Sequence, residues 1–114
     1  MMILKLGAIA CSRSGDKGKN SNVGIIFDNI DTYNWAKKNI TSSRVEDFFK
    51  DIVKGDVIRF ELDNLLSLNF ILEDSLGGGG SDSLINDAQG KTYGQAILLM
   101  EVEIPLELRK YIND

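Results

Sequence analysis

The stretch "SRSGDKGKNSN", residues 12–22, places eleven consecutive polar or glycine residues between two runs rich in apolar side chains. The runs are "ILKLGAIAC" (residues 3–11) before it and "NVGIIFD" (residues 22–28) after it. From Val23 to Phe27 the apolar side chains alternate, as in a strand with one buried face. The pattern therefore predicts two strands joined by a long polar loop over residues 12–22.

The composition is that of one globular domain over residues 1–114. The chain is 43% apolar and 26% charged, which are ordinary values for a folded domain, and a chain of this length forms a single core. The net charge of −4 disfavours a role in nucleic-acid binding, because phosphate contacts need a clustered basic surface. No apolar run approaches the roughly 20 residues that a membrane helix requires. We expect a cytoplasmic protein with no membrane contact.

Beyond residue 28 the apolar pattern predicts helices and strands in alternation. A helix over 32–39 precedes a stronger one over 43–53, which begins with a Ser43 and Glu46 capping box and is followed by Gly55 as a left-handed residue. The remaining predicted elements are a half-buried strand over 56–63, a helix over 65–76, a short strand over 82–87, a strand over 94–104 and a helical turn over 106–112.

This order of elements predicts where the two glycine-rich segments lie. Strands joined through a helix run parallel, and strands joined directly by a loop pair antiparallel. The strands at 22–28 and 56–63 then run in one direction, and the helix at 65–76 returns to "GGGG" at 77–80. We therefore expect the 12–22 loop and the tetraglycine at the same end of the sheet.

The 12–22 loop is a candidate anion site. Its three basic residues, Arg13, Lys17 and Lys19, outweigh Asp16, which gives the loop +2 and leaves −6 for the rest of a chain of −4. Successive glycines let backbone amides converge on one point, as in anion-binding nests. The same residues are also compatible with a plain turn that carries solvated charges. Neutral donors in the loop are Ser12, Ser14, Asn20, Ser21 and Asn22.

The tetraglycine and Asn69 each have two interpretations. The tetraglycine follows a predicted helix, whose free carbonyl groups disfavour an anion, so it either permits close backbone approach or touches a ligand. Asn69 lies beside the apolar stripe of the predicted 65–76 helix, and a partly buried amide needs partners. It is either a tether between the helix and a loop or a ligand contact.

The chain contains no histidine, which removes Ser-His and Cys-His mechanisms and most catalytic zinc sites. We therefore expect no metal and no cofactor, and we interpret the lone Cys11 as a buried structural thiol. Acid–base chemistry would fall to a small set of residues, and the sequence leaves open whether the protein is an enzyme. That set is Asp16, Lys17, Asp82 and Asp87.

Three segments carry a family resemblance: "SRSGDKGKNSNVGI" (12–25), "LDNLLSLNFILEDSLGGGGSDSL" (62–84) and "DAQGKTYGQAILLMEVEIP" (87–105). In this order they closely resemble the C-terminal domain of the acyclic terpene utilisation (AtuA-type) proteins. The matching positions are Arg13 to Gly18, Ser21, Asn22, Gly24, Asn64, Leu68, Asn69, Phe70, Gly77 to Gly79, Asp87, Gly90, Lys91 and Gly94.

The resemblance implies an α+β fold, a two-layer ferredoxin-like sandwich with a mixed four- to five-stranded sheet and helices on one face. It also implies a role in the breakdown of branched or terpenoid acids as acyl-CoA thioesters. No catalytic residue is carried over from the family. Its members usually carry a large domain ahead of this segment, so we expect a free-standing domain that acts with a larger protein partner, as a homo-oligomer, or both.

These observations give one leading functional hypothesis and two others. The leading hypothesis is a small subunit whose glycine-rich basic loop binds an anionic group, such as the carboxylate or phosphates of an acyl-CoA. One alternative is a non-enzymatic protein-interaction or oligomerisation module, and another is a hydratase or isomerase assembled from several copies. The predicted ligand-binding residues are Arg13, Ser14, Gly15, Asp16, Lys17, Gly18, Ser21, Asn22, Asn69, Gly77, Gly78 and Gly79.

Overall fold

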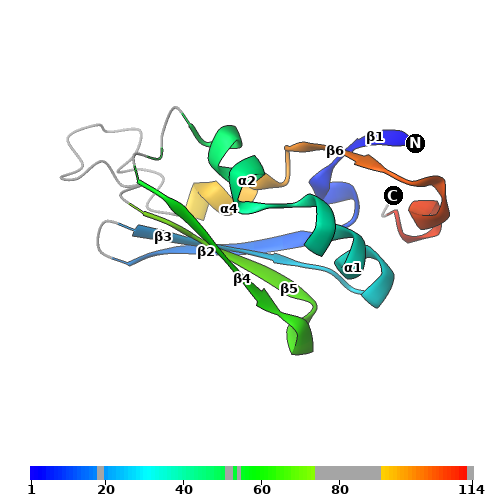
Figure 1. Cartoon of the computed structure of the whole chain (residues 1–114), viewed down its shortest axis with the longest axis horizontal. Helices are drawn as coiled ribbons and strands as arrows, with labels where there is room; N and C mark the ends of the chain where they lie inside the picture. The colour runs from blue at the N-terminus through cyan, green and yellow to red at the C-terminus, as the bar shows by residue number, and fades with distance from the viewer. Residues whose placement is uncertain (18–19, 51–52, 54, 74–90, 113–114) are drawn as a thin grey trace.

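The computed structural model describes residues 1–17, 20–50, 53, 55–73 and 91–112, with the backbone alone at 16, 17, 91 and 92. Figure 1 shows a layer of helices over one face of a sheet, with a smaller strand pair at one end. The described elements are β1 (Met2–Lys5), η1 (Leu6–Ala8), β2 (Cys11–Lys17), β3 (Asn20–Ile26), α1 (Ile30–Asn39), α2 (Ser42–Phe48), β4 (Val57–Leu62), η2 (Asp63–Leu65), β5 (Ser67–Leu72), α4 (Lys91–Ile97), β6 (Glu101–Ile104) and η3 (Leu106–Tyr111).

Among the described residues, the main sheet has four strands in the order β2, β3, β5, β4, and β1 pairs with β6 in a second, two-stranded sheet. Every neighbouring pair is antiparallel. The expected two-layer α+β architecture, with the helices on one face of the main sheet, is confirmed (Figure 1). The sheet is not mixed as expected: β3 and β4 do run in the same direction, but β5 lies between them.

The polar stretch over 12–22 is mostly a hairpin rather than a long loop. β2 and β3 pair from Cys11 opposite Ile26 to Lys17 opposite Asn20, which leaves two residues outside the described part. Strand pairing depends on backbone groups, so polar side chains do not prevent it. The prediction treated polarity as a sign of a loop, whereas here small and polar side chains occupy both faces of a hairpin.

Within the helix predicted over 65–76, residues 65–72 instead form the end of η2 and strand β5, and residues 74–76 lie outside the described part. Leu66 takes a left-handed conformation with φ of 49°, which turns the chain into β5. Leu68, Phe70 and Leu72 then point into the core. The helical interpretation arose because Leu68 and Leu72 lie four residues apart, a spacing that falls on one face in a helix and also in a strand.

Residues 94–104, predicted as one strand, are divided between α4 and β6. The run "AILLM" is apolar at every position, so it carries no period that distinguishes a helix from a strand. Alternation appears only in β6, where Val102 and Ile104 are buried. The predicted helical turn after Pro105 is confirmed as η3.

The helix over 32–39 is confirmed as α1, which Asn29 caps by accepting a bond from the backbone N–H of Thr32. The capping box predicted for the second helix is wrong. The hydroxyl of Thr41, not of Ser43, accepts a 3.2 Å bond from the Arg44 backbone N–H, so Arg44, not Glu46, stands at the position that a capping box requires to be Glu or Gln.

The second helix also ends earlier than expected. α2 stops at Phe48, so Gly55 does not terminate it. Gly55 instead donates a 3.0 Å backbone bond to the carbonyl oxygen of Glu73. This contact joins the start of β4 to the end of β5, where the two chain segments pass close to one another.

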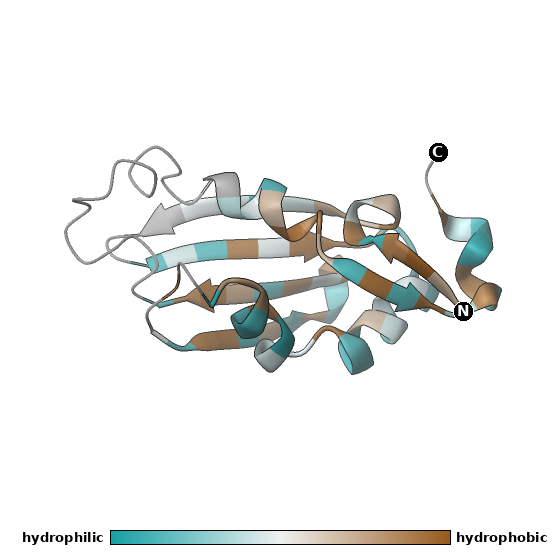
Figure 2. Cartoon of the chain, turned by 90° about the horizontal axis from the view of Figure 1, so that it is seen from above, coloured by the Kyte–Doolittle hydropathy of each residue, from teal (hydrophilic) through white to brown (hydrophobic). Residues whose placement is uncertain are grey.

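The core lies between the helices and the main sheet. In Figure 2 apolar residues concentrate in β4, β5 and the second half of β3, beside the more polar β2. The predicted strand over 56–63 is confirmed as β4, but its apolar alternate residues face solvent. Ile58, Phe60 and Leu62 are 41%, 49% and 40% exposed. The largest fully buried side chains are Tyr33, Phe70, Leu6, Ile9, Ile25, Ile40, Leu68, Leu72, Ile97, Ile104, Val23 and Val45.

Candidate functional site

The predicted site residues of the hairpin divide between the two faces of the main sheet, because neighbouring strand residues point in opposite directions. On the helix side, the Ser12 hydroxyl donates a 2.6 Å bond to the Gly94 carbonyl oxygen, and the Gly94 N–H donates a 3.0 Å bond to Ser14 Oγ. Ser21 is buried on this side, opposite Leu72. Ser14 and Ser21 therefore both lie on the helix side, where Ser12 and Ser14 bond Gly94 of α4.

The other face of the main sheet, away from the helices, is called the open face. Arg13 lies directly opposite Gly24 on β3, and Gly24 lies opposite Asn69 on β5. In the next row Gly15 lies opposite Asn22. We call these five residues the open-face patch. The pairing brings the two predicted sequence segments, around Arg13 and around Asn69, to one place.

The glycines at 15 and 24 leave the centre of the open-face patch without side chains. A Cβ atom at Gly24 would lie 3.6 Å from Asn69 Oδ1, and one at Gly15 would meet nothing within 4 Å. Adjacent strands are about 4.8 Å apart, so the backbones at Arg13 and Asn69 are separated by about 10 Å. A group that rests on Gly24 would thus have a guanidinium on one side and an amide on the other.

The donors of the open-face patch are available for a ligand. Within the part of the chain that the structure describes, the side chains of Arg13, Asn22 and Asn69 make no hydrogen bond or ion pair. Among the described side chains that the four strands place on the open face, Arg13 alone carries a charge. A guanidinium with two neutral amides is a donor set suited to a carboxylate or a phosphate.

Several predicted residues fall outside the described part. Gly18, Gly77, Gly78 and Gly79 do so entirely, as do the possible acid–base groups Asp82 and Asp87 and the predicted strand over 82–87. Asp16 and Lys17 belong to β2 by their backbone alone. The expected meeting of the two glycine-rich segments therefore stays a prediction. β5 ends with Leu72 opposite Ser21.

The interpretation of Cys11 as buried was wrong, because the residue is exposed at the first position of β2. It lies opposite Ile26 on the open face, where no helix covers it.

Among the described residues, no group of three or more Cys, Asp or Glu side chains is placed to hold a metal ion. In the same part of the chain, every helix is too short or too polar to cross a bilayer.

A contact between a buried tyrosine and a carboxylate lies at the other end of the sheet and joins two elements of the fold. The Tyr33 hydroxyl donates a 2.6 Å bond to Asp63 Oδ1, and Lys37 Nζ lies 3.4 Å from the same oxygen. Burial, together with the bond to Asp63, raises the pKa of Tyr33. The bond from Tyr33, with the charge of Lys37, holds the pKa of Asp63 below its usual value. This contact joins α1 to the turn between β4 and β5.

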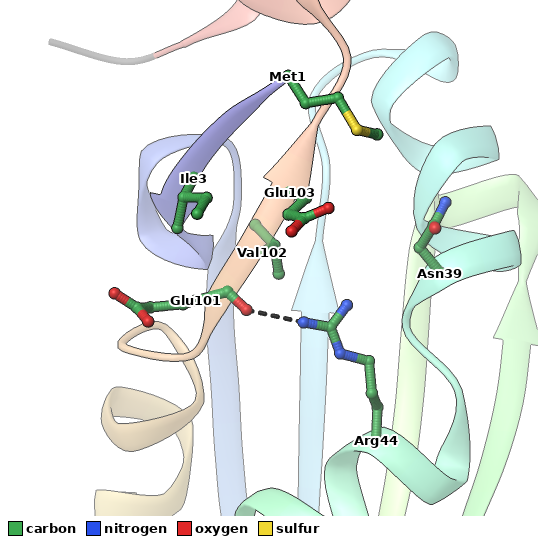
Figure 3. A pocket seen from close by; sticks show the side chains of 7 residues that line it. All are labelled: Met1, Ile3, Asn39, Arg44, Glu101, Val102 and Glu103. Atoms are coloured by element: carbon green, nitrogen blue, oxygen red, sulfur yellow. Dashed lines mark hydrogen bonds between the residues drawn. The ribbon is translucent and has the colours of Figure 1, made fainter.

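Sequence reasoning missed a groove of about 410 Å³ between the β1–β6 pair and the first two helices. Figure 3 shows Arg44 reaching from α2 to the backbone of β6, where it donates a 2.8 Å bond to the Glu101 carbonyl oxygen. The walls of the groove come from three segments far apart in the chain, so no sequence motif marks the groove. The lining residues are Met1, Ile3, Asn39, Arg44, Glu101, Val102 and Glu103.

The groove is a weaker anion site than the open-face patch, because Arg44 is already bonded and two glutamates lie beside it.

Comparison with known protein families matches residues 4–103 to the AtuA ferredoxin-like domain. Comparisons with curated proteins and with solved structures give no match. The family match agrees with the α+β architecture and with the motif positions on β2, β3 and β5. The chain therefore belongs to the AtuA ferredoxin-like domain family.

Proposed function

We propose that this domain binds an anionic group of a metabolite at the open-face patch and acts with a larger protein in the breakdown of branched or terpenoid acyl-CoA compounds. The metabolic context comes from the family resemblance. The binding proposal rests on one observation: the register places Arg13, Gly24 and Asn69 side by side on the open face.

Physical chemistry favours an anion at this position. A guanidinium binds carboxylate or phosphate through two parallel hydrogen bonds, and such charged bonds contribute about 1.5–3 kcal/mol each. The Asn22 and Asn69 amides supply neutral donors to the remaining oxygens. The glycines at 15 and 24 let those oxygens approach the sheet closely. On a chain of net charge −4, one exposed cation between amides is a local positive site.

Calorimetric titration with coenzyme A, acetyl-CoA and inorganic phosphate tests this proposal. We expect binding of at least one of these anions, and we expect Arg13→Ala and Asn69→Ala each to weaken it by tenfold or more. Arg109→Ala is the matched control, because Arg109 is an exposed cation on η3, away from the open face. Equal affinity of the Arg13→Ala variant and the parent chain would refute the site.

A comparison of phosphate with acetyl-CoA separates anion binding from recognition of the acyl carrier. If phosphate binds as tightly as acetyl-CoA, the patch recognises an anion without selecting the acyl carrier. Thermal denaturation gives a second readout, because a ligand at one hundred times its Kd stabilises the folded state by about 2.7 kcal/mol.

The second candidate function is a protein-interaction or oligomerisation module without catalysis. The exposure of Ile58, Phe60 and Leu62 on one strand favours it, because apolar clusters on a surface commonly mark interaction sites. An unchanged melting temperature with all three anions, together with self-association of the purified chain, would support this function over anion binding.

A further inference from the structure

Strand β4 has a free edge with a defined set of backbone groups. Within the described residues it is the last strand in the order of the main sheet and pairs with β5 alone. The Glu73 N–H bonds the Asp56 carbonyl oxygen, so residue 56 directs its backbone groups toward β5. Because bonding alternates along an antiparallel strand, residues 58, 60 and 62 also face β5. The free N–H and C=O groups are then those of Val57, Arg59 and Glu61.

The same strand carries its charged residues, Arg59 and Glu61, on the helix side and its apolar residues on the open face. Its sequence, "VIRFEL", contains no lysine and no proline, which are the residues that commonly block edge pairing. Its outward side chains Ile58, Phe60 and Leu62 are all exposed. An unpaired edge with exposed apolar side chains is a template for another strand.

We propose that β4 pairs antiparallel with β4 of a second copy of this chain, about a twofold axis at Phe60. In this register Phe60 faces its own counterpart, and Ile58 faces Leu62 of the second copy. The six apolar side chains then form one cluster on the joined open face. This inference does not depend on anion binding at the open-face patch.

Charge favours this register over those centred on Arg59 and on Glu61. With the axis at Phe60, Arg59 lies opposite Glu61 of the second copy, twice by symmetry. An axis at Arg59 would place two guanidinium groups opposite each other, and an axis at Glu61 would place two carboxylates opposite each other. Like charges directly opposite destabilise a strand pair, and opposite charges stabilise it.

The backbone pattern agrees with the same register. Residues 59 and 61 carry the free edge groups, so each Arg59 exchanges both backbone hydrogen bonds with Glu61 of the second copy, which gives four bonds in total. Arg59 is held in place within its own chain, because its Nη1 donates to the carbonyl oxygens of Lys37 and Ile40 and its Nη2 bonds Glu61 at 2.7 Å. Both charged side chains thus already lie on the helix side of the strand.

The mass of the chain in solution, measured by sedimentation equilibrium, is the first test. We expect twice the mass of one chain for the parent, and the mass of one chain for Phe60→Glu, which places two carboxylates against each other at the axis. Ile3→Glu is the control, because Ile3 is exposed on β1 and outside β4. A monomeric parent at all concentrations, or a Phe60→Glu variant that remains dimeric, would overturn the proposal.

A cysteine scan tests the register. Cys11 is first replaced by serine, and Phe60→Cys is then compared with Ile58→Cys. Facing residues of a non-bonded antiparallel pair lie about 4.5 Å apart, within the range for a disulfide. Under mild oxidation we expect a covalent dimer for Phe60→Cys at tenfold or more the rate for Ile58→Cys. Equal rates, or faster linkage of Ile58→Cys, would show that another surface joins the copies.

Discussion

The hydroxyl of Tyr33 in α1 lies 2.6 Å from the carboxylate of Asp63, which begins the turn between β4 and β5. The ring of Tyr33 is fully buried, whereas Asp63 is at the surface. The bond therefore fixes the helical layer over the end of the β4–β5 hairpin. Because both partners can titrate, the contribution of this contact to stability falls at low pH and at high pH.

The first prediction concerns this pH dependence. The pKa of Asp63 is lower in the folded chain than in the unfolded one, so its contribution is present above the unfolded pKa of about 3.9 and is lost as the pH falls through the lowered folded value. The pKa of Tyr33 is raised, so its contribution is full below about pH 10 and is lost as the pH rises further. Tyr33→Phe should flatten both limbs of a stability profile from urea unfolding.

Tyr111→Phe is the comparison for this variant. Tyr111 donates a bond of the same length, 2.6 Å, to Asp31, but at an exposed position. We expect a smaller change in the free energy of unfolding at pH 7 for this variant than for Tyr33→Phe. Equal changes for the two variants would mean that burial of the ring does not strengthen the contact.

The second prediction concerns the start of α2. Because the hydroxyl of Thr41 caps the helix, Thr41→Ala should lower the free energy of unfolding by about 1 kcal/mol. Ser43→Ala should change it by less than about 0.5 kcal/mol, as for other exposed substitutions. The capping box expected from the sequence predicts the reverse order, so one pair of denaturant titrations decides between them.

The fold class followed from the family resemblance, and the elements with clear periods agree with it. α1 and β4 lie within two residues of their expected limits. The errors fell where a period is ambiguous. Leu68 and Leu72 fit a helix and a strand alike, and "AILLM" fits both. In β4 the pattern was read correctly, but local sequence cannot show that Ile58 and Phe60 face solvent, because that depends on which face the helices cover.

The arrangement of the predicted site residues differs from the one expected. Arg13, Asn22 and Asn69 do lie together on the open face, yet the expectation was a loop beside a helix end. Ser14 was expected among the ligand-binding residues, but its Oγ bonds Gly94 on the opposite face. A residue 80 positions away in the chain decided that role, and no local pattern indicates such a contact.

The third prediction tests the contact between α4 and β2. A Cβ at Gly94 would lie 2.7 Å from Ser14 Oγ and 3.1 Å from Ser14 Cβ. Gly94→Ala should therefore destabilise the chain by about 1–3 kcal/mol through overpacking, despite the helix preference of alanine. Adding Ser14→Gly removes both crowded atoms. In a double-mutant cycle we expect a favourable coupling of at least about 0.5 kcal/mol, and additive effects would show that the two residues do not touch.

The fourth prediction compares two glycines. A Cβ at Gly55 would lie 2.7 Å from the backbone oxygen of Glu73, and a backbone atom held by the ladder cannot move aside. Gly55→Ala should therefore lower the free energy of unfolding by about 1–3 kcal/mol.

Gly15→Ala should have the opposite effect on stability. The added methyl group enters open space on an extended strand, so the variant should gain about 0.5–1 kcal/mol. The same methyl group keeps the anion from approaching the sheet closely at the open-face patch. Affinity for the anion should therefore fall while stability rises. A Gly15→Ala chain that is more stable and binds the anion as tightly as its parent would place the ligand away from Gly15, since overall unfolding could not account for the result.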